Sequence, residues 1–129
     1  MHFRCSFREV ILMYNGPERR RHPRLTIGFV VSHRVKDSGG TYELSLTQNI
    51  SQGGMFITAS RQYAPHSDLE LMLRFPFVRE RVKLTGKVLD SKEVAKNMIY
   101  ATRIQFLDPE EEILRKLGSF IQSRLLASA

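Results

Sequence analysis

Alternation of apolar and polar residues from Leu25 to Phe106 is the feature that most limits the folds open to this chain. Apolar side chains at every second position predict strands that bury one face and expose the other. Short turn-rich segments such as Asp37–Gly40 separate these stretches and leave no room for the crossover helices of a parallel sheet. We therefore predict antiparallel strands at residues 25–32, 42–47, 55–59, 69–75, 82–89 and 99–106.

Six such strands at short spacing predict a mainly all-β fold, either an antiparallel barrel or a sandwich. The polar segment Lys92–Asn97 is predicted to be a loop. A chain of 129 residues is long enough for one domain with its own core. Residues 1–16 are predicted to be an N-terminal tail, loosely ordered or forming an extra strand or helical turn. Their apolar run, Val10–Tyr14, is too short to span a membrane.

One helix is predicted near the C-terminus, over residues 109–127. Asp108 is placed to act as N-cap, Pro109 suits the first helical position, and Glu111 adds an acidic residue to the first turn. Apolar residues then recur at helical spacing, at Ile113, Leu114, Leu117, Phe120, Ile121 and Leu125. This stripe predicts packing on the barrel, and a dimer interface is the alternative.

The segment 18–24, with the sequence ERRRHPR, concentrates positive charge ahead of the first predicted strand. Pro23 makes it a poor helix interior, so we predict a semi-rigid loop. Guanidinium groups are planar forks that suit phosphate oxygens or the O6/N7 edge of guanine. The net charge is +7, and residues 1–24 hold six arginines against two glutamates, so a phosphate-bearing partner is indicated. The arginines of the loop are Arg19, Arg20, Arg21 and Arg24.

A second segment, Asn49–Phe56 with the sequence NISQGGMF, interrupts the strand pattern. Asn49 and Ser51 are short polar residues that favour turns and can hydrogen-bond nearby backbone or a ligand. Gly53 and Gly54 permit positive φ and let another group approach the backbone closely. These features predict a tight polar turn between two strands.

The two segments together resemble the PilZ domain family, through Arg-x-x-x-Arg at Arg20 and Arg24 followed by Asn-x-Ser-x-x-Gly from Asn49 to Gly54. The resemblance covers residues 17–129 and implies a six-stranded antiparallel β-barrel over residues 25–107 with a C-terminal α-helix. It also implies binding of the bacterial second messenger cyclic dimeric GMP, by the arginine loop and the polar turn together. Many relatives have Asp where this chain has Asn49.

The ligand-contacting residues implied by the resemblance lie in both segments: Arg19, Arg20, Arg24, Asn49, Ser51, Gly53 and Gly54. In the family, an arginine at the position of Arg19 accompanies a stacked pair of ligand molecules, so we expect two per protomer. Arg103, on the last predicted strand, faces either the ligand or solvent, and the sequence does not decide which.

The expected function is that of a cytoplasmic sensor that binds cyclic dimeric GMP and relays it to an unidentified downstream protein by conformational change. We expect no metal, because the four histidines and Cys5 show no ligand spacing. We expect no enzymatic activity, because the serine and histidine residues lack a nucleophile-elbow context, and we expect no cofactor. The alternative is a small basic barrel that binds nucleic acid, which would need exposed aromatic residues for stacking. The sequence contains no tryptophan, which disfavours this alternative. We expect no membrane span. The sequence does not identify the downstream partner, and it leaves homodimer formation open.

Overall fold

The computed structural model describes residues 22–127 of the protein. Six strands and one helix make up its regular elements within these residues. They are β1 (Val30–Val35), β2 (Glu43–Ile50), β3 (Gly54–Ala59), β4 (Asp68–Leu73), β5 (Val82–Ala95), β6 (Ile99–Leu107) and α2 (Glu111–Ala127).

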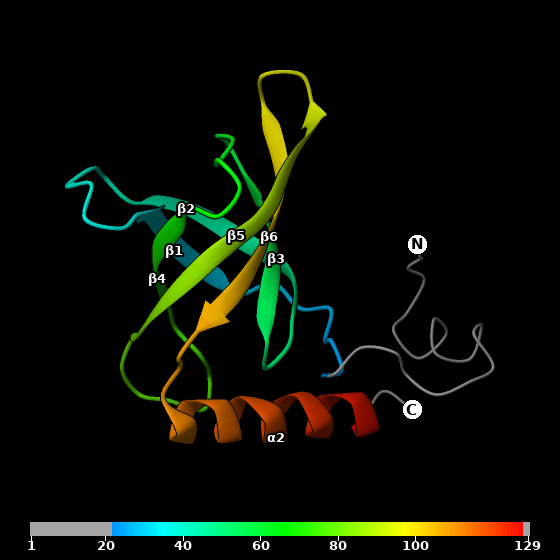
Figure 1. Cartoon of the computed structure of the whole chain (residues 1–129). Helices are drawn as coiled ribbons and strands as arrows, with labels where there is room; N and C mark the ends of the chain where they lie inside the picture. Colours follow the sequence, from blue (N-terminus) through cyan, green and yellow to red (C-terminus); the bar gives the residue numbers. More distant parts are fainter. Residues whose placement is uncertain (1–21, 128–129) are drawn as a thin grey trace.

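The strands form a closed antiparallel barrel in the order β1-β2-β3-β6-β5-β4. The barrel closes where β1 pairs with β4, with Val31 opposite Leu73. Figure 1 shows β5 and β6 continuing beyond the barrel as a hairpin arm, while α2 lies across the opposite end. The predicted fold, a six-stranded antiparallel barrel followed by a helix, is confirmed.

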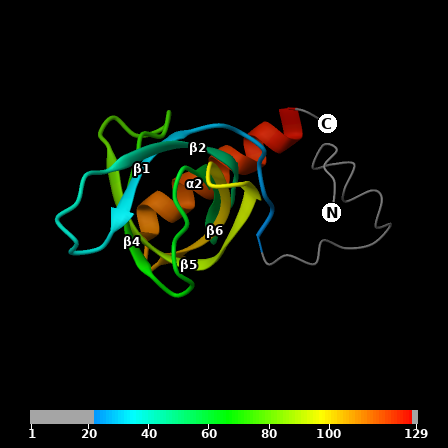
Figure 2. The same cartoon turned by 90° about the horizontal axis from the view of Figure 1, so that it is seen from above.

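The core fills the barrel and the space between its lower end and α2, which Figure 2 shows lying across the barrel when seen from above. Leu117 and Ile121 of α2 are each 2% exposed. The ring of Phe120 lies 5.9 Å from that of Phe29 and 5.4 Å from that of Phe77, in tilted contacts that join the helix to the barrel. The apolar stripe of the helix therefore packs on the barrel, as predicted.

The first strand begins later than predicted. Regular pairing starts at Val30, although the alternation predicted a start at Leu25. Leu25 and Phe29 are nonetheless buried. Pairing is interrupted because the N–H of Phe29 donates to the Oγ1 of Thr47, at 2.8 Å, a side chain that takes the place of a backbone acceptor. Alternation thus identified the buried face correctly but not which backbone groups pair.

The predicted loop at Lys92–Asn97 is wrong over its first part. β5 continues to Ala95, which pairs with Ile99, and the turn follows with Asn97 at φ 57°. This part of the hairpin projects beyond the barrel (Figure 1), and Val94 is 62% exposed. Because both faces of the arm meet solvent, its sequence carries no alternation from which a strand could be predicted.

The helix begins at Glu111, two residues after the predicted start. The carbonyl of Glu110 accepts a hydrogen bond from the N–H of Leu114 at 3.0 Å, so Glu110 occupies the N-cap position. The prediction of Asp108 as N-cap is wrong: Asp108 has φ 42° and forms the bend between β6 and α2. Glu111 and Glu112 still place acidic residues in the first turn.

Candidate functional site

Backbone hydrogen bonds tie the segment before β1 to the end of β2. The N–H of Leu25 donates to the carbonyl of Ile50 at 2.8 Å, and the N–H of Ile50 donates to the carbonyl of Leu25 at 2.9 Å. In an antiparallel bridge the flanking residues also face one another, so Arg24 lies beside Ser51. Leu25 points into the core, so the exposed Arg24 lies on the outer side of the barrel.

The turn between β2 and β3 is held by Ser51. Its N–H donates to the carbonyl of Gly54 at 2.8 Å, and its Oγ accepts a hydrogen bond from the N–H of Gly53 at 3.1 Å. This second bond is the arrangement by which serine mimics a backbone turn. Ser51 is half-buried, and the turn it fixes lies next to Arg24.

Close approach, and not positive φ, explains the two glycines of this turn. Gly39 is the glycine with positive φ among the described residues. A Cβ added to Gly54 would overlap the carbonyl oxygen of Ile104, so this glycine lets β3 and β6 approach. A Cβ added to Gly53 would lie 3.3 Å from Cδ2 of His22. His22 belongs to the predicted arginine loop at residues 18–24, which we call the arginine segment. The predicted freedom of φ is not used at either position.

The fold therefore brings together five of the predicted ligand-contacting residues at one end of β2 and β3: Arg24, Asn49, Ser51, Gly53 and Gly54. Arg19 and Arg20 lie outside the described residues, as does the predicted tail at residues 1–16. The contact of any of these residues with a ligand stays a prediction.

Next to this turn, an ion pair lies on the outer face of the barrel. Arg103, undecided from the sequence, is on β6, and its Nε donates to Oδ2 of Asp90 on β5 at 3.0 Å. The hydrogen bond from Arg103 lowers the pKa of Asp90, and the same bond raises the pKa of Arg103. Phe56 of β3 is the strand partner of Asn49 on one side and of Arg103 on the other, so it lies between them on the sheet. Sequence reasoning missed Phe56 and Asp90, because Phe56 was assigned to an ordinary strand position and Asp90 lay just beyond the predicted strand at residues 82–89.

The turn is also linked to α2 by the side chain of Gln52. Its Nε2 donates to the carbonyl of Leu114 at 2.8 Å. A Cβ at Gly118 would lie 2.7 Å from Cδ of Gln52, so the glycine in the helix makes room for this side chain. A mid-helix glycine costs about 1 kcal/mol relative to alanine, and here its place is explained by the contact with the turn.

Inside the barrel, a buried polar cluster surrounds His33. Its Nδ1 is 2.6 Å from the hydroxyl of Tyr63 and its Nε2 is 2.7 Å from Oγ of Ser45. Burial lowers the pKa of His33 and raises the pKa of Tyr63 to about 12, so both are neutral at physiological pH. The N–H of Tyr63 donates to Oγ of Ser91 at 3.2 Å. Since its polar atoms are satisfied within the core, we interpret this cluster as structural.

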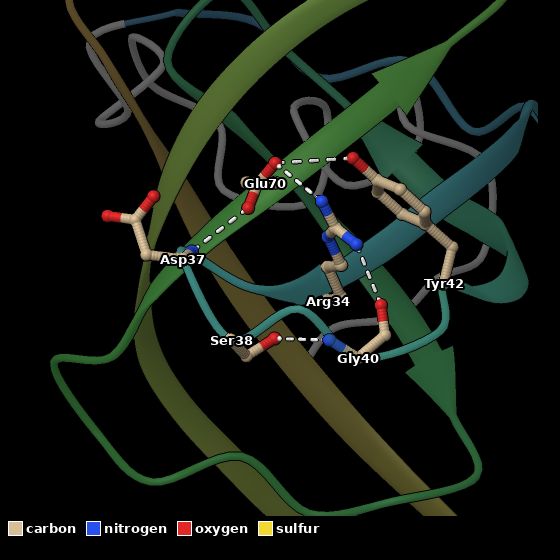
Figure 3. Close-up of polar contacts among 6 residues, drawn as sticks. All are labelled: Arg34, Asp37, Ser38, Gly40, Tyr42 and Glu70. Atoms are coloured by element: carbon tan, nitrogen blue, oxygen red, sulfur yellow. Dashed lines mark hydrogen bonds and ion pairs between the residues drawn. The ribbon is translucent and has the colours of Figure 1, made fainter.

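A second polar network fastens the β1–β2 loop to β4 (Figure 3). Glu70 accepts hydrogen bonds from the N–H of Asp37 at 3.0 Å, from Nη2 of Arg34 at 3.3 Å and from the hydroxyl of Tyr42 at 3.3 Å. The bond from Asp37, followed by that from Arg34, lowers the pKa of Glu70. Nη1 of Arg34 donates to the carbonyl of Gly40 at 2.7 Å. These contacts hold a loop in place, and we assign the network no ligand.

Among residues 22–127, no group of three or more His, Cys, Asp or Glu side chains is arranged to hold a metal ion. In the same part of the chain, no helix has the length and apolar character needed to cross a membrane.

A family model described as PilZ domain matches residues 18–123, which is most of the chain. The chain belongs to the PilZ domain family. The match begins with the arginine segment and ends within α2, so it contains both halves of the candidate site. The resemblance seen in the sequence is thus confirmed, whereas a search of curated proteins gave no match.

Several solved structures share the fold of this PilZ domain. The inhibitor of motility MotI/DgrA from Bacillus subtilis superposes with a TM-score of 0.73 at 16% identity, covering 86% of this chain and 53% of that one. The PilZ domain of YcgR from Escherichia coli, with c-di-GMP, gives 0.61 at 15% identity, covering 82% and 91%. The K. pneumonia MrkH–c-di-GMP complex gives 0.63 at 17% identity, covering 87% and 54%. This chain therefore spans about half the length of MotI/DgrA and MrkH, and at these identities the likeness establishes the fold.

Proposed function

We propose that this PilZ domain binds cyclic dimeric GMP where the arginine segment meets the β2–β3 turn, and that it signals the bound state to a partner protein. The observation that carries the proposal is the Leu25–Ile50 bridge, which brings Arg24 beside Ser51 at the turn. The YcgR and MrkH structures that share this fold contain c-di-GMP, which supports the choice of ligand. The proposed role is binding, without catalysis.

The chemistry of the site suits this ligand. Cyclic dimeric GMP carries two phosphates, which need cationic groups, and two guanines, which need hydrogen-bond partners at their edges. Arg24 and the preceding Arg19 and Arg20 supply guanidinium forks. Asn49 and Ser51 supply short polar side chains on the other side of the bound molecule.

The free energies are sufficient for micromolar binding. Each charge-assisted hydrogen bond contributes roughly 1.5–3 kcal/mol net. Association itself costs about 4–15 kcal/mol. Four to six such bonds contribute roughly 6–18 kcal/mol. Together with base stacking they can exceed the association cost by the roughly 8 kcal/mol that corresponds to a Kd of about 1 μM.

The relay is proposed to run through Gln52 to the helix. A ligand that presses on the turn displaces Gln52, whose side chain is hydrogen-bonded to the carbonyl of Leu114 and occupies the space left by Gly118. The arginine segment supplies a second switch, because its like charges repel one another until an anion neutralises them. The partner would then recognise a changed surface formed by α2 and the arginine segment.

Isothermal titration calorimetry of the full chain with cyclic dimeric GMP tests this function. We expect a Kd in the micromolar range or tighter and a stoichiometry of two ligands per protomer, the second figure resting on Arg19. GTP, cyclic GMP and single-stranded DNA serve as competitors, and each should bind at least about tenfold more weakly. Tight binding of single-stranded DNA without measurable binding of cyclic dimeric GMP would refute the sensor function and favour the nucleic-acid-binding alternative. A stoichiometry near one would refute the stacked pair of ligand molecules but would not contradict the proposed binding site.

A further inference from the structure

Four side chains form one row across the outer face of strands β2, β3, β6 and β5. Asn49 pairs with Phe56, Phe56 with Arg103, and Arg103 with Asp90. Residues directly opposite one another share a face of the sheet. Neighbouring strands are about 4.8 Å apart, so Arg103 lies about 10 Å from Asn49 across the sheet. The row thus begins at the candidate site and extends away from the arginine segment.

Irregular pairing turns both ends of this row outward. In β5 the even-numbered residues up to Val88 are buried, and regular alternation would place Asp90 inside the barrel as well. A register shift between Val88 and Asp90 places Asp90 opposite Arg103 instead. A second shift, between the buried Thr47 and Asn49, does the same in β2. Bulges often re-aim side chains in this way next to functional sites.

The Arg103–Asp90 pair offers both donors and an acceptor to a ligand. Nε and Nη2 of Arg103 both donate to Oδ2 of Asp90. These two bonds hold the guanidinium plane, and they leave Nη1 of Arg103 and Oδ1 of Asp90 without a hydrogen-bond partner among residues 22–127. The side chain of Arg103 is 52% exposed and that of Asp90 is 26% exposed. Beside them, the half-buried ring of Phe56 supplies a flat apolar surface.

This combination matches a guanine base. Guanine presents acceptors at O6 and N7, which suit a guanidinium fork, and N–H donors on its pairing edge, which suit a carboxylate oxygen. Adenine has a donor amino group where guanine has O6, so it would face the donors of Arg103 with another donor. An aromatic ring contributes stacking to either base.

We propose that Phe56, Arg103 and Asp90 form a base subsite that takes one guanine of the bound nucleotide and discriminates against adenine. The proposal rests on the proposed function, since it concerns the same ligand, but it assigns base selection to β3, β5 and β6 and not to the arginine segment. Arg103 contacts the base edge, Asp90 orients Arg103 and accepts from the base, and Phe56 supports the ring.

Calorimetry with cyclic dimeric GMP and cyclic dimeric AMP on the full chain tests the subsite. Arg103→Met should weaken cyclic dimeric GMP binding by about tenfold or more, because it removes the fork. Arg103→Lys keeps the charge without the fork, so it should weaken cyclic dimeric GMP binding comparably and leave any cyclic dimeric AMP binding within about twofold. Phe56→Leu keeps an apolar side chain and should weaken binding of cyclic dimeric GMP by about fivefold or more, through lost stacking.

Arg81→Met is the matched control. Arg81 is exposed and lies nine residues before Asp90, roughly 30 Å away along β5 at about 3.3 Å per residue. The Arg81→Met substitution removes the same charge as Arg103→Met, so any loss of affinity common to the two variants reflects net charge alone. Thermal unfolding of each variant checks the fold, and if Arg103→Met does not fold, Arg103→Lys decides.

The outcomes separate the two proposals. Binding by the wild-type chain together with unchanged affinity in Arg103→Lys and Phe56→Leu would overturn the base subsite and leave the proposed function intact. Equal losses in the Arg103 variants and in Arg81→Met would also overturn the subsite. A wild-type chain that does not bind cyclic dimeric GMP would overturn both.

Discussion

Gly54→Ala tests why a glycine ends the turn of the candidate site. The sequence suggested that Gly54 makes room for a ligand, whereas the structure places it against β6. An added Cβ would overlap the carbonyl oxygen of Ile104 and lie 3.1 Å from Cα of Gln105. Both are backbone atoms of a paired strand, which cannot rotate away as the end of a side chain can. The substitution therefore has to push β3 and β6 apart.

The cost follows from that displacement. Overpacking by one methyl group typically costs about 1–3 kcal/mol, and a backbone clash belongs at the upper end. The smaller conformational entropy of alanine in the unfolded chain offsets about 0.4–1 kcal/mol of this. A net loss of about 2 kcal/mol lowers the Tm by about 10 °C in a domain of this size.

Thermal unfolding followed by circular dichroism measures this loss. Gly40→Ala is the matched control, because Gly40 is exposed and an added Cβ there would meet Oγ of Ser38 at an ordinary 3.5 Å. We expect this control to change stability by less than about 0.5 kcal/mol. A Tm of Gly54→Ala within about 2 °C of the wild type would refute the packing explanation. It would favour the alternative that Gly54 makes room for the ligand.

Three further predictions concern the core and the site. Thr47→Val removes the hydroxyl that bonds Phe29 and should lower the free energy of unfolding by about 1–3 kcal/mol in urea denaturation; an unchanged midpoint would contradict this. Because burial lowers the pKa of His33 below its ordinary 6.5, the unfolded chain takes up this proton more readily, so stability is full above pH 6.5 and falls as the pH drops below it. His33→Gln should lose that part of the pH dependence in urea titrations between about pH 5 and pH 8, and a wild-type curve that is flat over this range would count against a neutral His33. Arg20→Ala and Arg24→Ala should each weaken cyclic dimeric GMP binding at least about tenfold by calorimetry with unchanged Tm; normal binding by both would show the site assignment to be wrong.

Much of the fold was predictable because burial dictates side-chain pattern. The alternation of leucines at Leu69, Leu71 and Leu73 predicted β4 with only small boundary errors, and all three are at most 1% exposed. The apolar stripe of the helix likewise predicted its packing on the barrel. In both cases one face of the element meets the core and the other meets solvent, so the sequence records the difference.

The parts that were missed depend on backbone irregularity. The bulge that turns Asp90 outward leaves no signature in the alternation, because the shift at Leu89 only appears once β5 is paired with β6. The N-cap at Glu110 was missed because Asp108 has the more typical capping side chain. The hairpin arm at residues 92–95 has two exposed faces and therefore no pattern. Of the candidate site, the motif positions were predictable, whereas the outer-face row was not.

Mapping the ligand onto the chain by NMR tests the central claim most directly, namely that the arginine segment and the β2–β3 turn bind cyclic dimeric GMP between them. In a titration of the ¹⁵N-labelled full chain with cyclic dimeric GMP, the largest amide shift changes should fall at Arg24 and at Asn49–Gly54. Amides of the β1–β2 loop, near Asp37 and Gly40, should change little. The largest changes at that loop, or changes at the turn with none at Arg24, would contradict the claim.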